Sequence, residues 1–271
     1  MSNDMVLYEV TGQTAWITLN RPEALNAINE EMRLGIVEMC AQAQADRNVQ
    51  VVLVRGAGEK AFTVGGDLKE RAQRNADPAE AQASPLEARQ ARHLPGSSSP
   101  IEAFALLQKP SIALLHGYTV GAGLLIAMAC DIRIAADNAR LGVTEVRRGF
   151  MPASGGTQRL ARIVGPAKAL EICLSGELID AREAYRIGLV NKLVSMDELT
   201  QAGEEMAAAF AKGAPLALRY VKESVHKGVD LPLDQALRLE SDLAAFVLTT
   251  EDSKEGPRAF VEKRPPVWKG R

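Results

Sequence analysis

Three glycine-rich turns carry the residues of this chain whose spacing could support catalysis. They are Ala61–Leu68, His116–Gly123 and Pro152–Thr157, and each precedes an expected helix. Such turns expose backbone N–H groups, and a helix N-terminus adds the positive end of its dipole. Two N–H groups aimed at one point would form an oxyanion hole. One such turn is explained by tight folding alone, but three together indicate a site.

Other catalytic patterns are missing or incomplete. Gly121-x-Gly123 begins a dinucleotide fingerprint, but Ile126 stands where the third glycine is required. The chain contains no G-x-x-x-x-G-K-[ST] loop and no G-x-S-x-G elbow. The sequence therefore argues against a Rossmann enzyme, a P-loop NTPase and an α/β-hydrolase.

The spacing of the cysteines and histidines indicates neither a metal site nor a disulfide framework. These residues are Cys40, Cys130, Cys173, His93, His116 and His226. No pair has C-x-x-C or H-E-x-x-H spacing. We expect the cysteines to pack as small apolar side chains.

The elements that must position the glycine turns follow an α/β pattern. Two strands flanking Gly12-Gln13 predict a hairpin, and later strands run into glycine loops followed by helices. The expected strands are 5–10, 14–19, 49–54, 111–116 and 132–135, and the expected helices are 26–40 and 123–130. Strand, glycine loop and helix recur, which favours βα crossovers.

After Pro166 the chain becomes strongly helical. The expected helices are 167–174, 181–187, 197–211, 215–226, 233–248 and 251–262. We therefore predict an α/β core over 1–195 and a helical C-terminal region over 196–271. The stretch 72–100 has the composition of an exposed helix followed by a mobile loop.

Composition and charge are those of an ordinary globular protein. The 271 residues are 46% hydrophobic and 24% charged, and 32 Lys and Arg against 34 Asp and Glu leave a net charge of −2. This balance argues against a nucleic-acid-binding protein. Residues 1–10 lack a signal-peptide pattern, and the uncharged stretch 111–130 is broken by glycines. We expect a cytoplasmic protein that does not span a membrane.

Seven segments resemble the enoyl-CoA hydratase/isomerase (crotonase) family over almost the whole chain. They are Ile17–Ala27, Lys60–Glu70, Lys109–Ala113, His116–Tyr118, Ala127–Ala135, Gly155–Leu160 and Ala259–Arg264. The resemblance implies an α/β fold with a crotonase-like spiral of ββα units and a helical C-terminal trimerisation region. It also implies that the protein assembles as a homotrimer or a dimer of trimers. The expected role is in lipid and fatty acid metabolism. The substrate would be an acyl-CoA thioester, so coenzyme A enters with the substrate and no separate cofactor or metal is expected.

The resemblance assigns roles to individual residues. Gly66 and Ala122 match the residues whose backbone N–H groups form the oxyanion hole, and Gly66 is expected where backbone approaches the thioester closely. Residues matching the lining of the CoA path are Ala24, Ala61, Val64, Gly65, Asp67 and Leu68. Phe260 and Lys263 match C-terminal residues that meet CoA, often from a neighbouring subunit; a solvated helix face is the alternative for Lys263.

The family's hydratases use two glutamates, and here the chain departs from them. Glu145 matches one, whereas the other position holds Leu125, expected to form a pocket wall. A leucine there resembles some Δ3-Δ2-enoyl-CoA isomerases of the family. Single-glutamate hydratases and lyases also exist, and the segment 152–159 is more hydratase-like. The resemblance therefore leaves hydration and isomerisation both open.

Glu145 is the candidate base for removing a thioester α-proton, because burial would raise its pKa toward the neutral range. The alternative is a surface glutamate paired with Arg147 or Arg148. Those arginines could meet a charged substrate tail or form a solvated face. The alternative function is a non-catalytic crotonase-fold protein that binds acyl-CoA or RNA.

Overall fold

The structure is a computed structural model that describes residues 4–76 and 99–271. The mobile loop expected within 72–100 lies largely outside these residues. The strands are β1 (Val6–Thr11), β2 (Thr14–Leu19), β3 (Val51–Gly56), β4 (Ala61–Thr63), β5 (Ser111–Leu115), β6 (Tyr118–Val120), β7 (Ile132–Ala136), β8 (Arg140–Gly142), β9 (Ile179–Asp180) and β10 (Lys192–Val194). The helices of the first half are η1 (Pro22–Ala24), α1 (Glu30–Ala45), α2 (Leu68–Ala76), α4 (Pro100–Ala105) and α5 (Ala122–Ala129). Those of the second half are η3 (Glu145–Arg148), α6 (Gly156–Val164), α7 (Pro166–Ser175), α8 (Ala181–Arg186), α9 (Leu199–Ala211), α10 (Pro215–Gly228), α11 (Leu233–Leu248) and α12 (Asp252–Val261).

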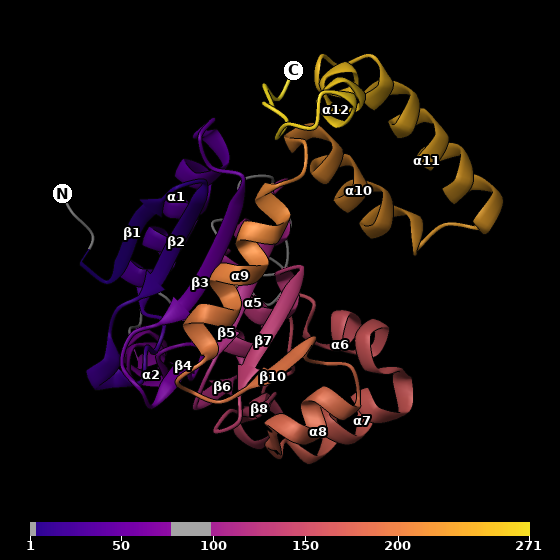
Figure 1. Ribbon diagram of the computed structural model, residues 1–271. Coiled ribbons are helices and arrows are strands. Elements are labelled where there is room, and N and C mark those ends of the chain that lie inside the picture. The colour runs from indigo at the N-terminus through magenta and orange to yellow at the C-terminus, as the bar shows by residue number, and fades with distance from the viewer. Residues whose placement is uncertain (1–3, 77–98) are drawn as a thin grey trace.

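Two sheets organise the core (Figure 1). The larger has the order β1-β2-β3-β5-β7-β10; β1 pairs antiparallel with β2, and the remaining strands are parallel. The smaller has the order β4-β6-β8-β9. Each strand of the large sheet from β3 to β7 is followed by one of the small sheet. The predicted fold class, an α/β crotonase-like spiral of ββα units, is confirmed.

Strand β5 explains why the large sheet is buried on both faces. Its side chains alternate between two apolar clusters, one containing Ala113 and Leu115 and the other Ile112 and Leu114. Helices α1, α4 and α5 contribute to the first cluster, and α9 contributes to the second. An uninterrupted apolar run is typical of a parallel strand covered on both sides.

Helix α9 belongs to this core by its packing. Leu199 and Ala202 are buried against the sheet, and a Cβ on Gly203 would lie 2.8 Å from Leu114 Cδ2. Figure 1 shows α9 crossing the front of the large sheet. The expected boundary at 195/196 placed α9 in the C-terminal region, whereas its apolar face makes it a core helix. The helices that leave the core are α10, α11 and α12.

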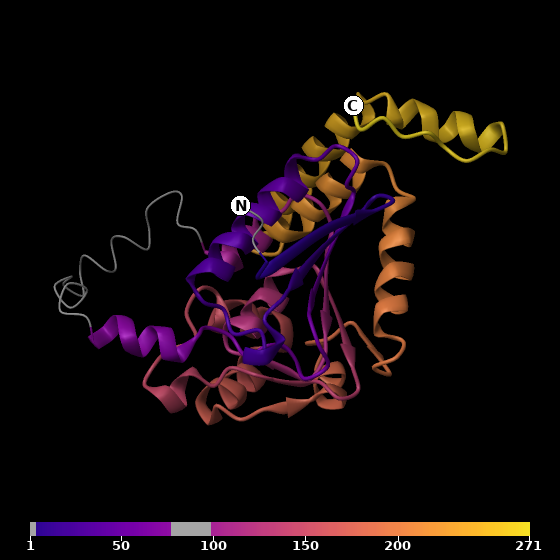
Figure 2. The same ribbon diagram turned by 90° about the vertical axis from the view of Figure 1, so that its left-hand side faces the viewer.

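These last three helices project from the α/β core (Figure 2). Lys222 and His226 of α10 hold them to the core through Asp131, with Nζ–Oδ2 and Nε2–Oδ1 distances of 2.8 and 2.7 Å. Val221 and Val225 of α10 are 64% and 60% exposed. The C-terminal helices thus keep an apolar face that nothing in the chain covers within the described residues.

The small sheet was missed in the sequence, which predicted only glycine-rich turns there. Its strands are two or three residues long, too short to show an alternating pattern. In the described ranges 4–76 and 99–271, no helix is long and apolar enough to cross a bilayer.

Candidate active site

The first two glycine turns meet at Gly65. Its φ is +87°, and a Cβ there would lie 2.8 Å from the Ala122 nitrogen and 2.9 Å from the Val120 oxygen. A side chain would therefore collide with the backbone at the start of α5. Gly65 is the residue that lets the two turns touch.

The backbone amides of Gly66 and Ala122 are both unoccupied at this contact. The Ile28 amide donates to the Gly65 oxygen at 2.8 Å, and the Asp67 amide donates to the Ile28 oxygen at 2.9 Å. Gly66 lies between these bonds, and its own amide meets no acceptor in the described chain. Ala122 begins α5, so its N–H has no intrahelical acceptor. Two free donors beside a helix N-terminus suit a developing oxyanion.

Gly66 itself has room for a side chain. Nothing lies within 4 Å of a Cβ built on it, and its φ lies outside the left-handed region. The close contact between the two protein backbones therefore lies at Gly65, and the expected approach of the Gly66 backbone to a thioester stays a prediction.

A buried polar network fixes this turn. Thr63 Oγ1 donates to the Asn26 oxygen at 2.6 Å and accepts from the Gly65 amide at 3.0 Å. Asn26 Nδ2 donates to the oxygens of Ala57 and Ala61. Thr63 and Asn26 are both fully buried. The network therefore fixes the segment 63–66 through hydrogen bonds that do not involve solvent.

The carboxylate of Asp67, a residue predicted to line the CoA path, makes its hydrogen bonds within the protein. Arg21 Nη1 lies 2.6 Å from Oδ2, and Oδ1 accepts from the amides of Lys69 and Glu70 at the start of α2. The hydrogen bond from Arg21 is the main reason that the pKa of Asp67 lies below its ordinary value. Asp67 therefore anchors α2 directly after Gly66.

The carboxylate of Glu145 faces the same turn from η3. Its Oε1 would lie 3.2 Å from a Cβ on Gly121, the N-cap of α5 with φ +56°. Its Oε2 is buried and has no hydrogen-bond partner among the residues that the structure describes. Burial raises the pKa of Glu145 above its ordinary value, against the opposing effects of nearby backbone amides and Arg148. A carboxylate with a raised pKa is a competent proton carrier.

Leu125 stands one turn along α5 from Gly121, so both residues lie on the same helix face. It is 4% exposed, and a Cβ on Gly156 would lie 3.2 Å from its Cδ1. Leu125 thus packs against the start of α6, on the helix face that also meets Glu145. This placement agrees with an apolar wall beside the candidate base.

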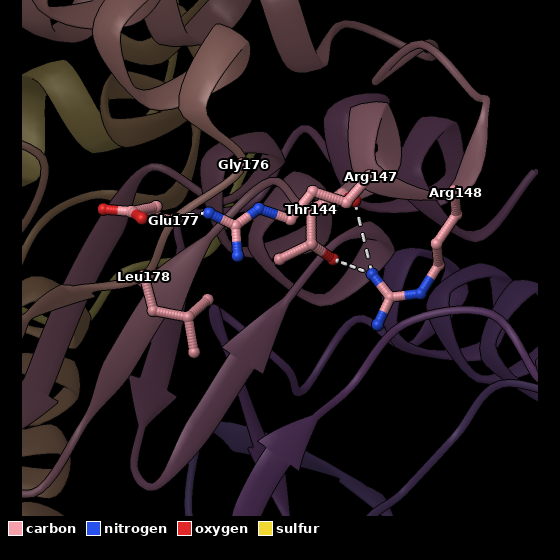
Figure 3. A pocket seen from close by; sticks show the side chains of 6 residues that line it. All are labelled: Thr144, Arg147, Arg148, Gly176, Glu177 and Leu178. Atoms are coloured by element: carbon pink, nitrogen blue, oxygen red, sulfur yellow. Dashed lines mark hydrogen bonds and ion pairs between the residues drawn. The ribbon is translucent and has the colours of Figure 1, made fainter.

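Arg147 and Arg148 point to opposite sides of η3 (Figure 3). Arg147 donates to Glu177 Oε1 at 3.0 Å and to the Ser175 oxygen at 2.9 Å, whereas Arg148 donates to Thr144 Oγ1 at 2.6 Å. These side chains line an open cavity of about 580 Å³ together with Gly176 and Leu178. Neither arginine pairs with Glu145, and both have protein partners.

The structure brings most of the predicted CoA-path residues together but not the C-terminal pair. The Val64 amide donates to the Leu25 oxygen at 3.2 Å, so the segment containing Ala24 runs beside the one following Ala61. Leu68 follows at the exposed start of α2. Phe260 is 86% exposed, and α12 lies at the opposite end of the molecule from α2 in both views (Figures 1 and 2).

Several site features escaped the sequence interpretation. The steric role of Gly121 and the Asn26–Thr63 link depend on contacts between distant segments. Cys173 on α7 is half-buried, and burial followed by the Glu145 charge raises the pKa of its thiol. Among residues 4–76 and 99–271, no cluster of three or more His, Cys, Asp or Glu could hold a metal ion.

Comparison with known proteins agrees with this arrangement. The profile of the enoyl-CoA hydratase/isomerase family matches residues 9–271. The chain is 38% identical to the short-chain-enoyl-CoA hydratase of Clostridium acetobutylicum, covering 97% of both chains. It is 37% identical to the (E)-benzylidenesuccinyl-CoA hydratase of Thauera aromatica, covering 98% of this chain and 99% of that one. A crystal structure of an enoyl-CoA hydratase from Bacillus anthracis matches with a TM-score of 0.88 at 34% identity, covering 98% and 100% of the two chains. The resemblance read from the sequence is confirmed, and the chain belongs to the enoyl-CoA hydratase/isomerase family, the crotonases.

Proposed function

We propose that this crotonase acts on an enoyl-CoA thioester through an enolate, with Glu145 as the acid/base. The amides of Gly66 and Ala122 would bind the thioester oxygen, where negative charge develops. The observation that carries this proposal is the placement of the Glu145 carboxylate against Gly121, next to the free Ala122 amide. A base beside free amide donors is the arrangement that α-proton transfer requires, and these contacts support it.

The oxyanion hole supplies the larger share of the barrier reduction. Loss of one such donor in other enzymes costs about 2.7–4 kcal/mol. Glu145 adds a positioned base whose buried, partnerless Oε2 can accept a proton. In isomerisation it would take a proton from C2 of a 3-enoyl thioester, forming a dienolate, and return that proton to C4.

Hydration is the leading reaction, because both named relatives are hydratases. Glu145 would then accept a proton from one water as the water oxygen adds to C3 of a 2-enoyl thioester, and would deliver that proton to C2 of the resulting enolate. Double-bond migration is the second candidate, because Leu125 places an apolar side chain where it offers water no partner.

A screen with 2-enoyl, 3-enoyl and 3-hydroxyacyl-CoA thioesters tests the proposal. Product analysis separates hydration from double-bond migration for each acyl chain. Turnover of at least one class, abolished in Glu145→Gln, is the expected result. No turnover of any thioester by folded protein would contradict it. Activity should survive dialysis against a chelator, since the proposed chemistry uses no metal.

We also propose that the chain assembles as a homotrimer or a dimer of trimers. The exposed residues Val221, Val225 and Val229 recur every four positions along and just past α10, which makes an apolar stripe. Phe260 and Lys263 would then reach the CoA of a neighbouring subunit. Sedimentation at several protein concentrations tests the assembly, and a stable monomer would contradict it.

A further inference from the structure

A cation–π contact joins the two walls of the candidate site. Arg71 lies one turn into α2, and its guanidinium carbon is 3.9 Å from the centroid of the Phe150 ring. Its backbone amide donates to Asp67, next to Gly66, while the Phe150 amide donates to the Glu145 oxygen at 3.0 Å. The contact therefore connects the segment carrying the oxyanion donor with the turn carrying the base.

Arg71 has no anionic partner in the part of the chain that the structure describes. On the same helix, Arg74 approaches Glu30 and Glu70, with N···O distances of 3.8 and 3.7 Å. On the other wall, Arg147 is paired with Glu177. Aromatic stacking uses the face of a guanidinium and leaves its in-plane N–H donors free. Arg71 is thus a positioned, unneutralised cation at the site.

We propose that Arg71, held by Phe150, binds a second carboxylate on the acyl group of the substrate. This inference rests on the proposed function and narrows it to enoyl-CoA thioesters of dicarboxylic acids. The guanidinium fork matches a carboxylate in a bidentate geometry. The main-chain hydrogen bond from the Phe150 amide to the Glu145 carbonyl oxygen ties the Phe150 backbone to the turn that carries the proposed base.

The phosphates of CoA are a second source of negative charge. The pantetheine arm separates them from the thioester by many bonds, whereas Phe150 is tied to the residue that meets the reacting carbons. The acyl carboxylate is therefore the partner that the geometry favours. Inhibition by free CoA distinguishes the two, because free CoA carries the phosphates and no acyl group.

The test compares glutaconyl-CoA with 2-pentenoyl-CoA, which carries a terminal methyl in place of the carboxylate. The readout is the ratio of the two kcat/KM values. In Arg71→Met this ratio should fall about 10- to 100-fold, the loss expected for a charge-assisted pair. Arg71→Lys should retain part of the ratio, because lysine keeps the charge without the fork. The matched control Arg74→Met removes one positive charge from the same helix and should keep the ratio within about twofold.

Each outcome has one consequence. A folded Arg71→Met protein with an unchanged ratio overturns the inference and leaves the proposed function standing. An equal loss for both substrates, with weaker inhibition by free CoA, overturns it in favour of the CoA phosphates. Failure of the wild-type protein to convert glutaconyl-CoA, while another enoyl-CoA thioester of the screen is converted, overturns the inference and leaves the proposed function standing. Failure with every thioester of the screen removes the proposed function, and the inference with it. If Arg71→Met does not fold, Phe150→Leu is measured instead, and an unchanged ratio there overturns the inference.

Discussion

Gly65 and Gly66 are neighbours, but the structure separates their roles. Position 65 requires a residue without a side chain, because a Cβ on Gly65 would lie 2.8 Å from the Ala122 nitrogen. Gly66 has open space and would contribute only its amide. A glycine required for sterics and one required for an N–H respond differently to substitution, so the two assignments can be tested separately.

Gly66→Pro deletes the amide hydrogen, and Gly66→Ala keeps it. We expect Gly66→Pro to lose about two to three orders of magnitude in kcat, the range for one oxyanion donor. Gly66→Ala should remain within about tenfold. Steady-state kinetics with circular dichroism as a folding check measures both. A folded Gly66→Pro protein with full activity would refute the oxyanion assignment.

Glu145→Gln removes the proposed base and keeps its shape. We expect turnover to fall by about two orders of magnitude or more, while the affinity for a CoA thioester changes little. Single-turnover kinetics and binding of a product thioester measure the two quantities. Near-normal turnover would exclude Glu145 from the mechanism.

The raised pKa of Glu145 also predicts a pH dependence. The base must be ionised to act. As the pH is lowered, kcat/KM should therefore decrease, with a midpoint above the ordinary carboxyl pKa of 4.5. The folded protein binds this proton more tightly than the unfolded chain, so the carboxylate lowers stability as pH rises above 4.5. Glu145→Gln should therefore melt higher than wild type at pH 7, and the difference should shrink toward pH 4. A lower melting temperature at both pH values would contradict this.

Leu125→Glu tests the apolar wall. A second carboxylate near Glu145 would raise one pKa of the pair, leaving one group protonated and one to orient water. We expect hydration of a 2-enoyl-CoA to increase relative to double-bond migration, at some loss of stability. Product ratios by chromatography measure the change. A folded mutant with an unchanged ratio would show that Leu125 lies outside the pocket.

At the scale of elements, the contact between β4 and α5 sets the geometry of the site. A Cβ on Gly123 would lie 2.4 Å from the Thr63 oxygen, so the helix is seated directly on the strand end. The Thr63 hydroxyl in turn accepts a hydrogen bond from the Gly65 amide and so fixes the position of Gly65. This contact positions the amides of Gly66 and Ala122, the two proposed oxyanion donors, since each belongs to a different ββα unit.

Thr63→Val should remove that link with little change in volume. We expect about 1–3 kcal/mol of destabilisation from the unpaired Gly65 amide, together with a lower kcat. Thr119 is the matched control, because it pairs with Thr63 in the sheet and is fully buried, yet its Oγ1 has no partner. Thr119→Val should be neutral or stabilising. Denaturant unfolding compares the two, and equal effects would argue against the network.

At the scale of the whole molecule, Asp131 connects the C-terminal helices to the core. Ser111 donates its amide and hydroxyl to Oδ2, while Lys222 and His226 approach from α10. Burial acts to raise the pKa of Asp131, but the His226 hydrogen bond and the Lys222 charge outweigh it and hold the pKa below 3.8. One carboxylate thus contributes two of the contacts that attach α10 to the core.

Asp131→Asn should weaken this attachment by about 1–3 kcal/mol. A carboxyl group whose pKa is lowered on folding contributes its full stability above pH 3.8, the unfolded pKa, and loses it as the pH falls toward the pKa in the folded protein. The mutant should lose this part of the acid sensitivity of wild type. Glu223→Gln is the control, because it breaks an α10 pair with the largely exposed Lys227 and should change stability by less than about 1 kcal/mol. Thermal melts from pH 3 to 7 measure both. Equal melts for Asp131→Asn and wild type would contradict the role of Asp131.

The family, the α/β class and most of the large sheet could be predicted from the sequence. Local patterns are sufficient for these features. Apolar runs such as Ile112–Leu115 indicate buried strands, and glycine-rich segments indicate turns. The sequence also identified Gly66, Ala122 and Glu145 as candidate site residues. They lie on three segments that meet at the Gly65–Ala122 contact and the Gly121–Glu145 contact, and their roles remain predictions.

Contacts between distant segments determine which glycine is sterically required, where α9 packs, and which arginine lacks an anionic partner within the described residues. Gly65 is required because Ala122, more than fifty residues away in sequence, packs against it. Likewise Arg147 is paired with Glu177, whereas within residues 4–76 and 99–271 the Arg71 guanidinium contacts the Phe150 ring and no carboxylate. These properties depend on contacts between distant segments, and a local sequence pattern carries no record of such a contact.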